Sequence, residues 1–370
     1  MLQNKSKSSW RSLVLLIAAV LIVMTVATAC GKKSETSTEG GTKEPTTQTG
    51  GEKPADNGNV VATYKGGTVT EAEFNKYATF FGFMNQQYAM MLSIPQYKEQ
   101  FLKEYVGYKI LFADIDDSTK KEADKDADEF EKQFSEAIEK QPQMKEAMDQ
   151  AGLTLEETKG FYHLVVSVMK DAESKVKDEA IKAEFDKDPE GFTLVEVRHV
   201  LVGLSKDDGS ERSKEDALKL ANEAKDKLKG GATWDEIAKE YSDDPGSKDT
   251  GGFYASKEVK SYVTAFREAS LKQPLNEIGE PVETEFGYHV IQVEKRQSQT
   301  YETMVESTKT SLRQQLASTI ISDFMSNELP GLLESVNLPQ EQPATEAPSS
   351  DTEGTKEEAP ATDDGAAKTQ

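Results

Sequence analysis

Cysteine and histidine are nearly absent from this sequence. Its 370 residues include one cysteine, Cys30, and three histidines, His163, His199 and His289. An intramolecular disulfide needs two cysteines, and the usual structural zinc sites need at least two thiolates, so both are excluded. Three histidines also make a histidine-rich metal site a poor candidate. We therefore expect neither a metal nor a cofactor.

Positive charge is scarce as well. Lys and Arg number 44 against 66 Asp and Glu, which gives a net charge of −22. Binding to nucleic acid without sequence specificity depends on neutralising phosphates, so no nucleic-acid partner is expected. The signatures of phosphate-binding loops, zinc proteases, serine hydrolases and dinucleotide-binding folds are all missing. Asp243, Asp244 and Asp249 lack the spacing and terminal Glu of a calcium-binding EF-hand.

Only one long apolar run is present, Leu13–Val26, and it follows a basic stretch and precedes small residues and Cys30. It is shorter than the roughly 20 residues of a spanning helix, and its layout is that of a secretory signal peptide over residues 1–29. Val26–Cys30 resembles the lipobox of bacterial lipoproteins. That resemblance implies acylation of Cys30 and a lipid anchor on the extracytoplasmic face of the cell membrane. The alternative is a retained signal anchor with Cys30 as a bystander.

Two segments have nothing to bury. Residues 30–58 contain no large apolar side chain and predict a disordered tether. Residues 338–370 carry eight acidic residues against two lysines and predict a disordered acidic tail. Folded structure is expected between them.

Residues 59–190 are expected to be mainly helical after a short hairpin. Val60–Tyr64 predicts a strand, Thr70 with Glu73 predicts a helix start, and Phe101–Ile115 predicts a second helix beyond an interruption at Pro95. Residues 116–150 are highly charged with sparse apolar positions. The aromatic and Met stripe of this region is interpreted as core, with an exposed cradle for client chains as the alternative.

Residues 191–296 have a different pattern, β-α-α-loop-α-β-β. His199 lies on the apolar face of one predicted strand and His289 on that of another, at opposite ends of the unit. A single such histidine is usually structural, but two of only three suggest a site if the strands are neighbours. Asp244, in the intervening loop, could then orient one imidazole.

Residues 297–337 predict a long amphipathic helix that ends at Pro330-Gly331. Its apolar stripe needs a partner, which we expect to be the N-terminal region. The expected fold class is α+β: a helical domain formed by the N- and C-terminal segments, with an inserted α/β domain whose antiparallel sheet is flanked by helices.

The insert resembles the parvulin-type peptidyl-prolyl isomerases. The matching pieces, in chain order, are V-R-H-V-L at Val197–Leu201, Y-S-D-D at Tyr241–Asp244, Gly251-Gly252, F-x-E-A at Phe266–Ala269 and G-E-P-V-x-T-x-F-G-Y-H at Gly279–His289. The resemblance implies that the chain is an enzyme that isomerises X-Pro peptide bonds.

By the same resemblance His199, His289 and Asp244 are the catalytic group. Phe266 would form the floor of the proline pocket, Thr284 would bond a histidine and Phe286 would line the site. The pocket Leu and Met of the family are absent; Tyr262 or Val259 occupies the region of the Met, and the spacing leaves the choice open.

The complete order, from the lipobox and tether through the helical region and isomerase domain to the C-terminal helix, resembles the PrsA-type foldase lipoproteins. Their helical part is similar to the SurA and trigger-factor chaperone regions. Unfolded or partly folded exported proteins would be the partners. The alternatives are a non-catalytic holdase with a degenerate isomerase domain, and a binding or scaffold lipoprotein. The sequence leaves the oligomeric state open, a homodimer included.

Overall fold

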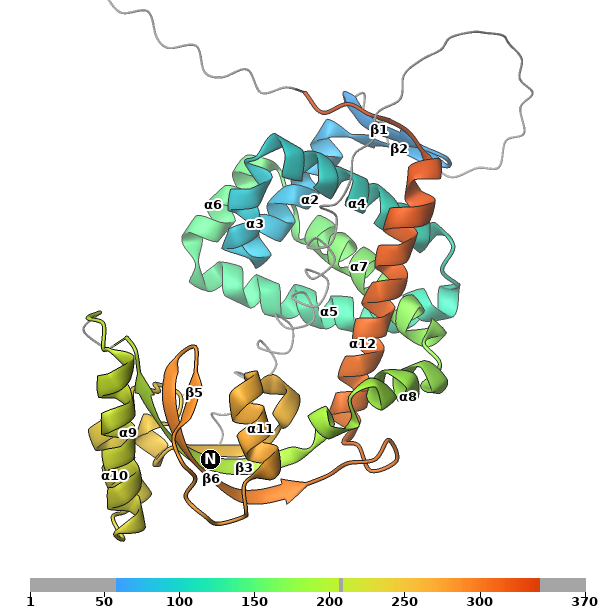
Figure 1. The fold of residues 1–370 in the computed structure, drawn as a ribbon. Coiled ribbons are helices and arrows are strands. Elements are labelled where there is room, and N and C mark those ends of the chain that lie inside the picture. Colours follow the sequence, from blue (N-terminus) through green and yellow to red (C-terminus); the bar gives the residue numbers. More distant parts are fainter. Residues whose placement is uncertain (1–57, 206–208, 340–370) are drawn as a thin grey trace, which may run out of the picture.

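The computed structural model describes residues 58–205 and 209–339 (Figure 1). The expected signal peptide, Cys30, and nearly all of the expected tether and acidic tail lie outside these residues. Within the described ranges no helix combines the length and apolarity needed to cross a membrane.

The first part of the chain forms a β-hairpin followed by a cluster of helices (Figure 1). Together with the C-terminal elements described below, we call it the helical body. Its N-terminal elements are β1 (Val60–Tyr64), β2 (Gly67–Thr70), α2 (Glu71–Met84), α3 (Gln86–Leu92), α4 (Pro95–Ala113), α5 (Asp117–Lys140), α6 (Pro142–Ala151), α7 (Leu155–Lys175) and α8 (Asp178–Lys187).

Local sequence signals account for most of these helix starts. The Thr70 hydroxyl accepts from the Glu73 amide at the start of α2, and Thr154 with Glu157 forms a reciprocal capping box at the start of α7. The sequence predicted an interruption at Pro95, but Pro95 instead occupies the first turn of α4. Proline is tolerated there because the backbone amides of the first turn have no partner within the helix. The helix therefore begins at Pro95 rather than at Phe101.

The charged stretch 116–150 forms two helices, α5 and α6. On α5 one stripe of small and aromatic side chains is buried and the charges face outward; Phe130 stacks on Tyr162 of α7, with ring centroids 4.3 Å apart. Phe74, Tyr77 and Phe101 are also fully buried. The aromatic stripe is thus core, as interpreted from the sequence.

The C-terminal segment returns to the helical body. Helix α12 (Glu306–Asp323) packs against α7 and α8, continues as a π-helix over Phe324–Glu328 and leads to β7 (Leu333–Val336). Strand β7 pairs antiparallel with β1, which completes a three-stranded sheet of order β2-β1-β7. The expected fold class, with a helical domain built from both ends of the chain and an inserted α/β domain, is confirmed.

The inserted part, which we call the α/β insert, spans Leu194–Gln297. Its four-stranded sheet has the order β4-β3-β6-β5 and all its strand pairs are antiparallel. Its elements are β3 (Leu194–Gly203), α9 (Lys214–Lys229), α10 (Trp234–Tyr241), β4 (Phe253–Glu258), α11 (Thr264–Lys272), β5 (Val282–Thr284) and β6 (Gly287–Gln297).

Both faces of this sheet are covered. Val200, Val202 and Val290 face α9 and α10, whereas Val197 and Ile291 pack on the other side with residues of α11. Polar contacts join the insert to the helical body: Arg267 Nη2 of α11 lies 2.5 Å from Asp188 Oδ1, after α8, and Glu258 at the end of β4 accepts from the Thr308 hydroxyl of α12.

Candidate active site

His199 and His289 come together because of the register of two neighbouring strands. In the β3–β6 pair, His199 lies opposite Ile291 and His289 opposite Leu201. Residues two positions apart on facing strands are diagonal neighbours on the same face of a sheet. The Nδ1 atoms of the two rings are 3.3 Å apart, and the residues are only 2% and 6% exposed.

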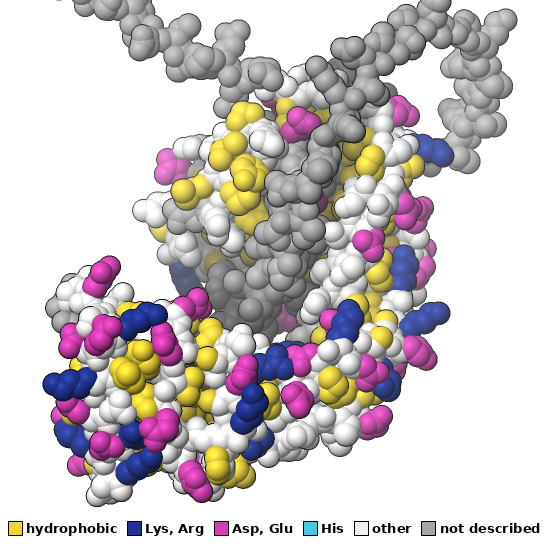
Figure 2. Space-filling model, viewed as in Figure 1, with side chains coloured by type: hydrophobic (Ala, Val, Ile, Leu, Met, Phe, Trp, Pro, Cys, Tyr) yellow, Lys and Arg dark blue, Asp and Glu magenta, His cyan; other side chains and the backbone are white. Residues whose placement is uncertain are grey.

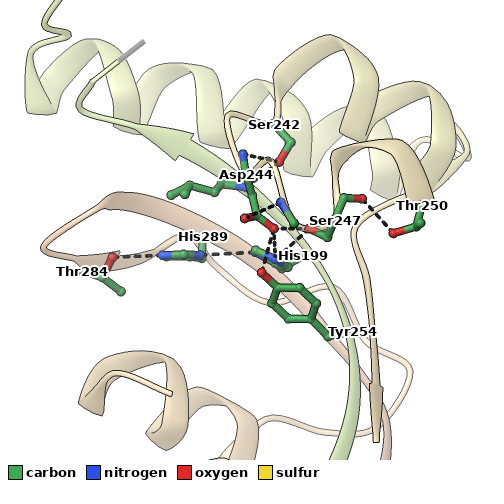
Figure 3. A network of polar contacts seen from close by, with 10 residues as sticks. His199, Ser242, Asp244, Ser247, Thr250, Tyr254, Thr284 and His289 are labelled. Carbon is green, nitrogen blue, oxygen red and sulfur yellow. Dashed lines mark hydrogen bonds and ion pairs between the residues drawn. The ribbon is translucent and has the colours of Figure 1, made fainter. Parts of the chain in front are cut away.

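The two imidazoles form the centre of a continuous chain of hydrogen bonds (Figure 3). On one side, His289 Nε2 is 2.9 Å from Thr284 Oγ1 at the end of β5. On the other, His199 Nε2 is 3.1 Å from Asp244 Oδ2 and 3.0 Å from Ser247 Oγ. Each ring nitrogen therefore has a polar partner, as buried polar groups require.

Asp244 lies in the loop after α10 and accepts from three side chains. His199 Nε2, Ser247 Oγ and the Tyr254 hydroxyl, at 2.8 Å, all reach its Oδ2 atom. Burial alone would raise the pKa of the Asp244 carboxyl, but these hydrogen bonds and the nearby His199 lower it well below its usual range. Asp244 is thus ionised across the physiological pH range.

His289 is uncharged at neutral pH. Burial, reinforced by the neighbouring His199, lowers the pKa of the His289 imidazole to about 3. A neutral imidazole carries one proton, so the two ring nitrogens of His289 serve as one donor and one acceptor towards Thr284 Oγ1 and His199 Nδ1, while His199 Nε2–H donates to Asp244.

Two glycines permit this close arrangement. Gly252 has φ = 71°, and a Cβ there would lie 2.0 Å from the His199 carbonyl oxygen; its own carbonyl accepts from the His199 amide at 2.9 Å. Gly287 has φ = 141°, and a Cβ would lie 2.1 Å from the Val202 carbonyl oxygen, in the turn that carries Thr284. Both glycines belong to the motifs identified in the sequence.

A cavity of about 550 Å³ opens beside the histidines. Phe266 of α11 lies against both imidazoles, with centroid distances of 5.4 Å to His199 and 5.2 Å to His289 and rings nearly perpendicular. Tyr262 also lines the cavity, and its ring centroid is 4.7 Å from that of Phe266. Phe286, which is 55% exposed, lies at the rim of the cavity. These apolar rings form a pocket next to a row of hydrogen-bonding groups.

Of the residues named from the sequence, two do not contact this cavity. Val259 is fully buried beneath the site, in a cluster with Phe266 and Ile291, whereas Tyr262 lines the cavity. Thr284 does not line the cavity either; its hydroxyl oxygen contacts His289 Nε2. The other named residues border the cavity: His199, Asp244, Phe266, Phe286 and His289.

Sequence reasoning missed Ser247 and Tyr254. Tyr254 follows the Gly251-Gly252 pair on β4, and its ring lies 4.7 Å from that of His199. Tyr254 stands where the family carries its pocket Leu. The absence of that Leu could have drawn attention to Tyr254. Ser247 stands three residues after Asp244, a spacing that gave no comparable signal.

The cavity combines apolar and polar side chains. In the ranges 58–205 and 209–339, no group of three or more His, Cys, Asp or Glu residues is placed to hold a metal ion. What the described residues offer is an apolar pocket beside two imidazoles, with the Asp244 carboxylate bonded to one of them.

Comparison with known proteins gives the class of the insert. Residues 180–297 match the family model of the PPIC-type peptidyl-prolyl isomerase domain. The α/β insert is therefore a parvulin-type peptidyl-prolyl cis/trans isomerase domain.

Whole-chain relatives give the family. The chain is 30% identical over 257 residues to the foldase protein PrsA of Caldanaerobacter subterraneus subsp. tengcongensis, covering 65% of this chain and 75% of that protein. It is 27% identical over 259 residues to foldase protein PrsA 4 of Bacillus cereus, covering 70% and 78%. A PrsA crystal structure from Bacillus anthracis aligns with 62% of this chain and 94% of that chain, at 22% identity and a TM-score of 0.36. The chain belongs to the PrsA foldase family.

Proposed function

We propose that this protein is a membrane-anchored extracytoplasmic foldase that catalyses cis/trans isomerisation of X-Pro bonds in exported polypeptides. The observation that carries the proposal is the meeting of His199 and His289, 3.3 Å apart, beside an apolar cavity with Phe266 against both rings.

The chemistry of the site suits this reaction. Rotation about an X-Pro bond breaks amide conjugation but forms and breaks no covalent bond, so no nucleophile, metal or nucleotide is required. In the twisted transition state the carbonyl is less polarised than in the planar amide. Phe266, Tyr262 and Phe286 would hold the proline ring against an apolar surface, which favours the twisted form over the hydrated ground state.

The polar row would position the bound amide. His199, fixed between Asp244 and His289, has no freedom to rotate without losing a hydrogen bond. Tyr254 and Ser247 hold the Asp244 carboxylate, and Thr284 holds His289. None of these groups has a covalent role.

The proposal also includes a lipid anchor on the protein and a class of substrate. The lipobox resemblance at Val26–Cys30 supports acylation of Cys30 and a location on the extracytoplasmic face of the cell membrane. The name foldase of the relatives supports unfolded polypeptides as substrates. Exposed apolar side chains on the helical body near α3 offer a contact surface for such chains: Met90 is 70%, Ile94 47% and Tyr97 44% exposed (Figure 2). Conversion of Cys30 to Ser should abolish lipid attachment, visible by mass spectrometry, and release the protein from membranes.

An isomerisation assay on a proline-containing peptide tests the catalytic part. His199→Ala and His289→Ala should each lower kcat/KM of the full chain at least about tenfold, because each breaks the hydrogen-bonded row. His163→Ala is the matched control: His163, on α7, bonds the Lys120 carbonyl at 3.0 Å and should be dispensable. Full activity in both site variants would refute the site assignment.

One observation favours a second candidate, a holdase without catalysis. Tyr254 and Tyr262 bring two phenols to a pocket in which the family carries Leu and Met, and their rings lie parallel 6.3 Å apart. If they fill the proline site, wild-type protein will show no isomerase activity yet still suppress aggregation of unfolded clients. Isomerase activity in the wild type would rule this candidate out.

A further inference from the structure

A second cavity lies in the helical body, well separated in the fold from the isomerase site. Its volume is about 600 Å³, and its walls are formed by α4, the last turn of α12 and the segment that follows α12. Close approach of these elements is possible because position 107 is glycine: a Cβ there would lie 2.2 Å from Met325 Sδ. The apolar part of the lining comes from Met325, Leu329, Pro330, Leu333 and Val336.

A buried carboxyl group borders this cavity. Glu104 of α4 is only 8% exposed, in a region whose other buried side chains are almost all apolar or aromatic. In the part of the chain that the structure describes, neither a hydrogen bond nor an ion pair to its carboxylate is recorded. Burying an ionised carboxylate without a partner is costly, so such a group is neutral or awaits a cation.

The surrounding groups do not neutralise Glu104. Lys103 borders the same cavity, but its ammonium binds Glu99 Oε1 at 2.6 Å. Glu334 of β7, at the cavity mouth, adds a further negative charge. Three phenols face the carboxyl from the core, and burial raises their pKa values, which keeps them uncharged at pH 7: Tyr77, Tyr88 and Tyr108.

We propose that this cavity is a binding subsite for a lysine or arginine side chain of an unfolded client polypeptide. Such a side chain has an apolar stem and a cationic head. The stem would lie along Met325 and Leu329 and the head would meet Glu104, with Glu334 attracting it at the mouth. The identity of the occupant as a polypeptide rests on the proposed foldase function; the cationic chemistry rests on the cavity itself.

Binding at this subsite would release a proton. Burial raises the pKa of the Glu104 carboxyl to about 8, so at pH 7 it is mostly protonated in the free protein. A bound cation stabilises the ionised form, and the proton leaves to solvent. Affinity for a cationic peptide should therefore rise from pH 6 to pH 8.

A pair of fluorescent peptides tests the proposal on the full chain. One is unstructured, proline-free and carries a single lysine; its twin carries Nε-acetyllysine instead. Anisotropy titration at pH 7 should show the acetylated twin binding about tenfold more weakly. Glu104→Gln should bind both twins alike, whereas Glu129→Gln, an exposed acid on α5, should behave as the wild type.

Calorimetry adds a readout that a merely structural role would not change. Titration at pH 7 in two buffers of different ionisation enthalpy should show release of close to one proton with the lysine peptide and none with Glu104→Gln. Equal affinity of the wild type for both twins, or a lysine preference that persists in Glu104→Gln, would overturn the proposal. Displacement of the peptide by free spermidine at equal concentration would assign the cavity to small amines and overturn the polypeptide occupant.

Because the peptides contain no proline, the result is independent of isomerase chemistry. His199→Ala should retain the lysine preference even where it loses isomerisation. Failure of the subsite and failure of the proposed catalytic function are therefore separate outcomes.

Discussion

Two carboxyl groups, one in each part of the molecule, are removed from solvent and respond in opposite ways. Asp244 of the α/β insert accepts hydrogen bonds from three side chains, and these lower the pKa of its carboxyl despite burial. Glu104 of the helical body has no comparable set of donors among the described residues, and burial raises the pKa of its carboxyl to about 8. The comparison shows that the partners of a buried acid, rather than burial itself, decide whether it carries charge.

This difference gives the two regions opposite responses to pH. The pKa values of Asp244 and His289 are lowered in the folded state, so their contribution to stability is complete above their unfolded values and is lost as the pH falls. The pKa of Glu104 is raised, so its contribution is complete below its unfolded value of 4.5 and is lost as the pH rises through about 8. A fall in pH below the unfolded pKa values therefore weakens the insert, and a rise in pH from 4.5 to about 8 weakens the helical body.

The largest expected effect tests whether the two regions unfold separately. Phe130→Ala should destabilise the helical body by about 3–5 kcal/mol, because Phe130 is fully buried between aromatic rings and its loss leaves a cavity. The insert should be unaffected. Urea unfolding followed by circular dichroism should show an early helical transition, while isomerase activity persists at low urea.

Ile237→Ala is the matched change in the insert, since Ile237 of α10 is 2% exposed. It should shift only the transition reported by Trp234, whose indole donates to Gln292 Oε1 at 2.9 Å. Trp10→Phe makes Trp234 the only tryptophan of the chain. One shared transition in all variants would contradict the separation of the two regions.

Glu104→Gln should remove the loss of folding stability of the helical body that accompanies a rise in pH. At pH 8.5 the variant should be more stable than the wild type by on the order of a few kcal/mol, because it has no buried carboxylate to ionise. At pH 4.5 the two should be nearly equal. Denaturant titrations across this range measure the difference; parallel curves for wild type and variant would show that Glu104 is not the responsible group.

Much of the fold could be predicted because local signals agreed with the final structure. The Thr154–Glu157 capping box and the alternating apolar pattern around His199 define their elements without tertiary help. The charged stretch 116–150 was harder to interpret: α5 buries a narrow stripe that includes Ala123 and Ala127, and alanine gives a weak hydrophobic signal. Strands β4 and β7 were missed because each is an exposed edge strand whose polar residues need no alternation.

The site could be predicted in part for a similar reason. Strand alternation places His199 and His289 on apolar faces, but only the β3–β6 register brings the rings together, and register is a tertiary property. Tyr254 joins the network through its hydroxyl, which depends on the bend of the Asp244 loop. Glu104 gave no signal at all, because one acid on a predicted helix is normally an exposed residue.

Asp244→Asn should have an intermediate effect. It replaces the ionised carboxylate of the insert by a neutral group, so that position 244 resembles the protonated Glu104 of the helical body. Asn keeps one oxygen for His199, Ser247 and Tyr254, but it carries no charge, and its amide group would replace the Oδ1 atom that accepts from the Gly246 amide. We expect a loss of about 1–3 kcal/mol of stability at pH 7 and about a tenfold fall in kcat/KM, from urea titration and the peptide assay. The stability difference from wild type should shrink as the pH falls below 4, where the native carboxylate begins to lose its advantage. A difference that does not change with pH would assign the effect to packing instead of charge.

Tyr254→Phe should have the smallest effect and shows how many donors an ionised buried acid requires. The variant keeps the ring beside His199 and removes only the hydroxyl that donates to Asp244 at 2.8 Å. His199 and Ser247 remain, so we expect at most about a fivefold decrease in kcat/KM, equivalent to about 1 kcal/mol. The pKa of Asp244 should rise but stay below its usual value, which carboxyl NMR titration can measure. If this single substitution raised the pKa of Asp244 above its usual value, the remaining two donors would be insufficient against burial, and Asp244 would behave like Glu104.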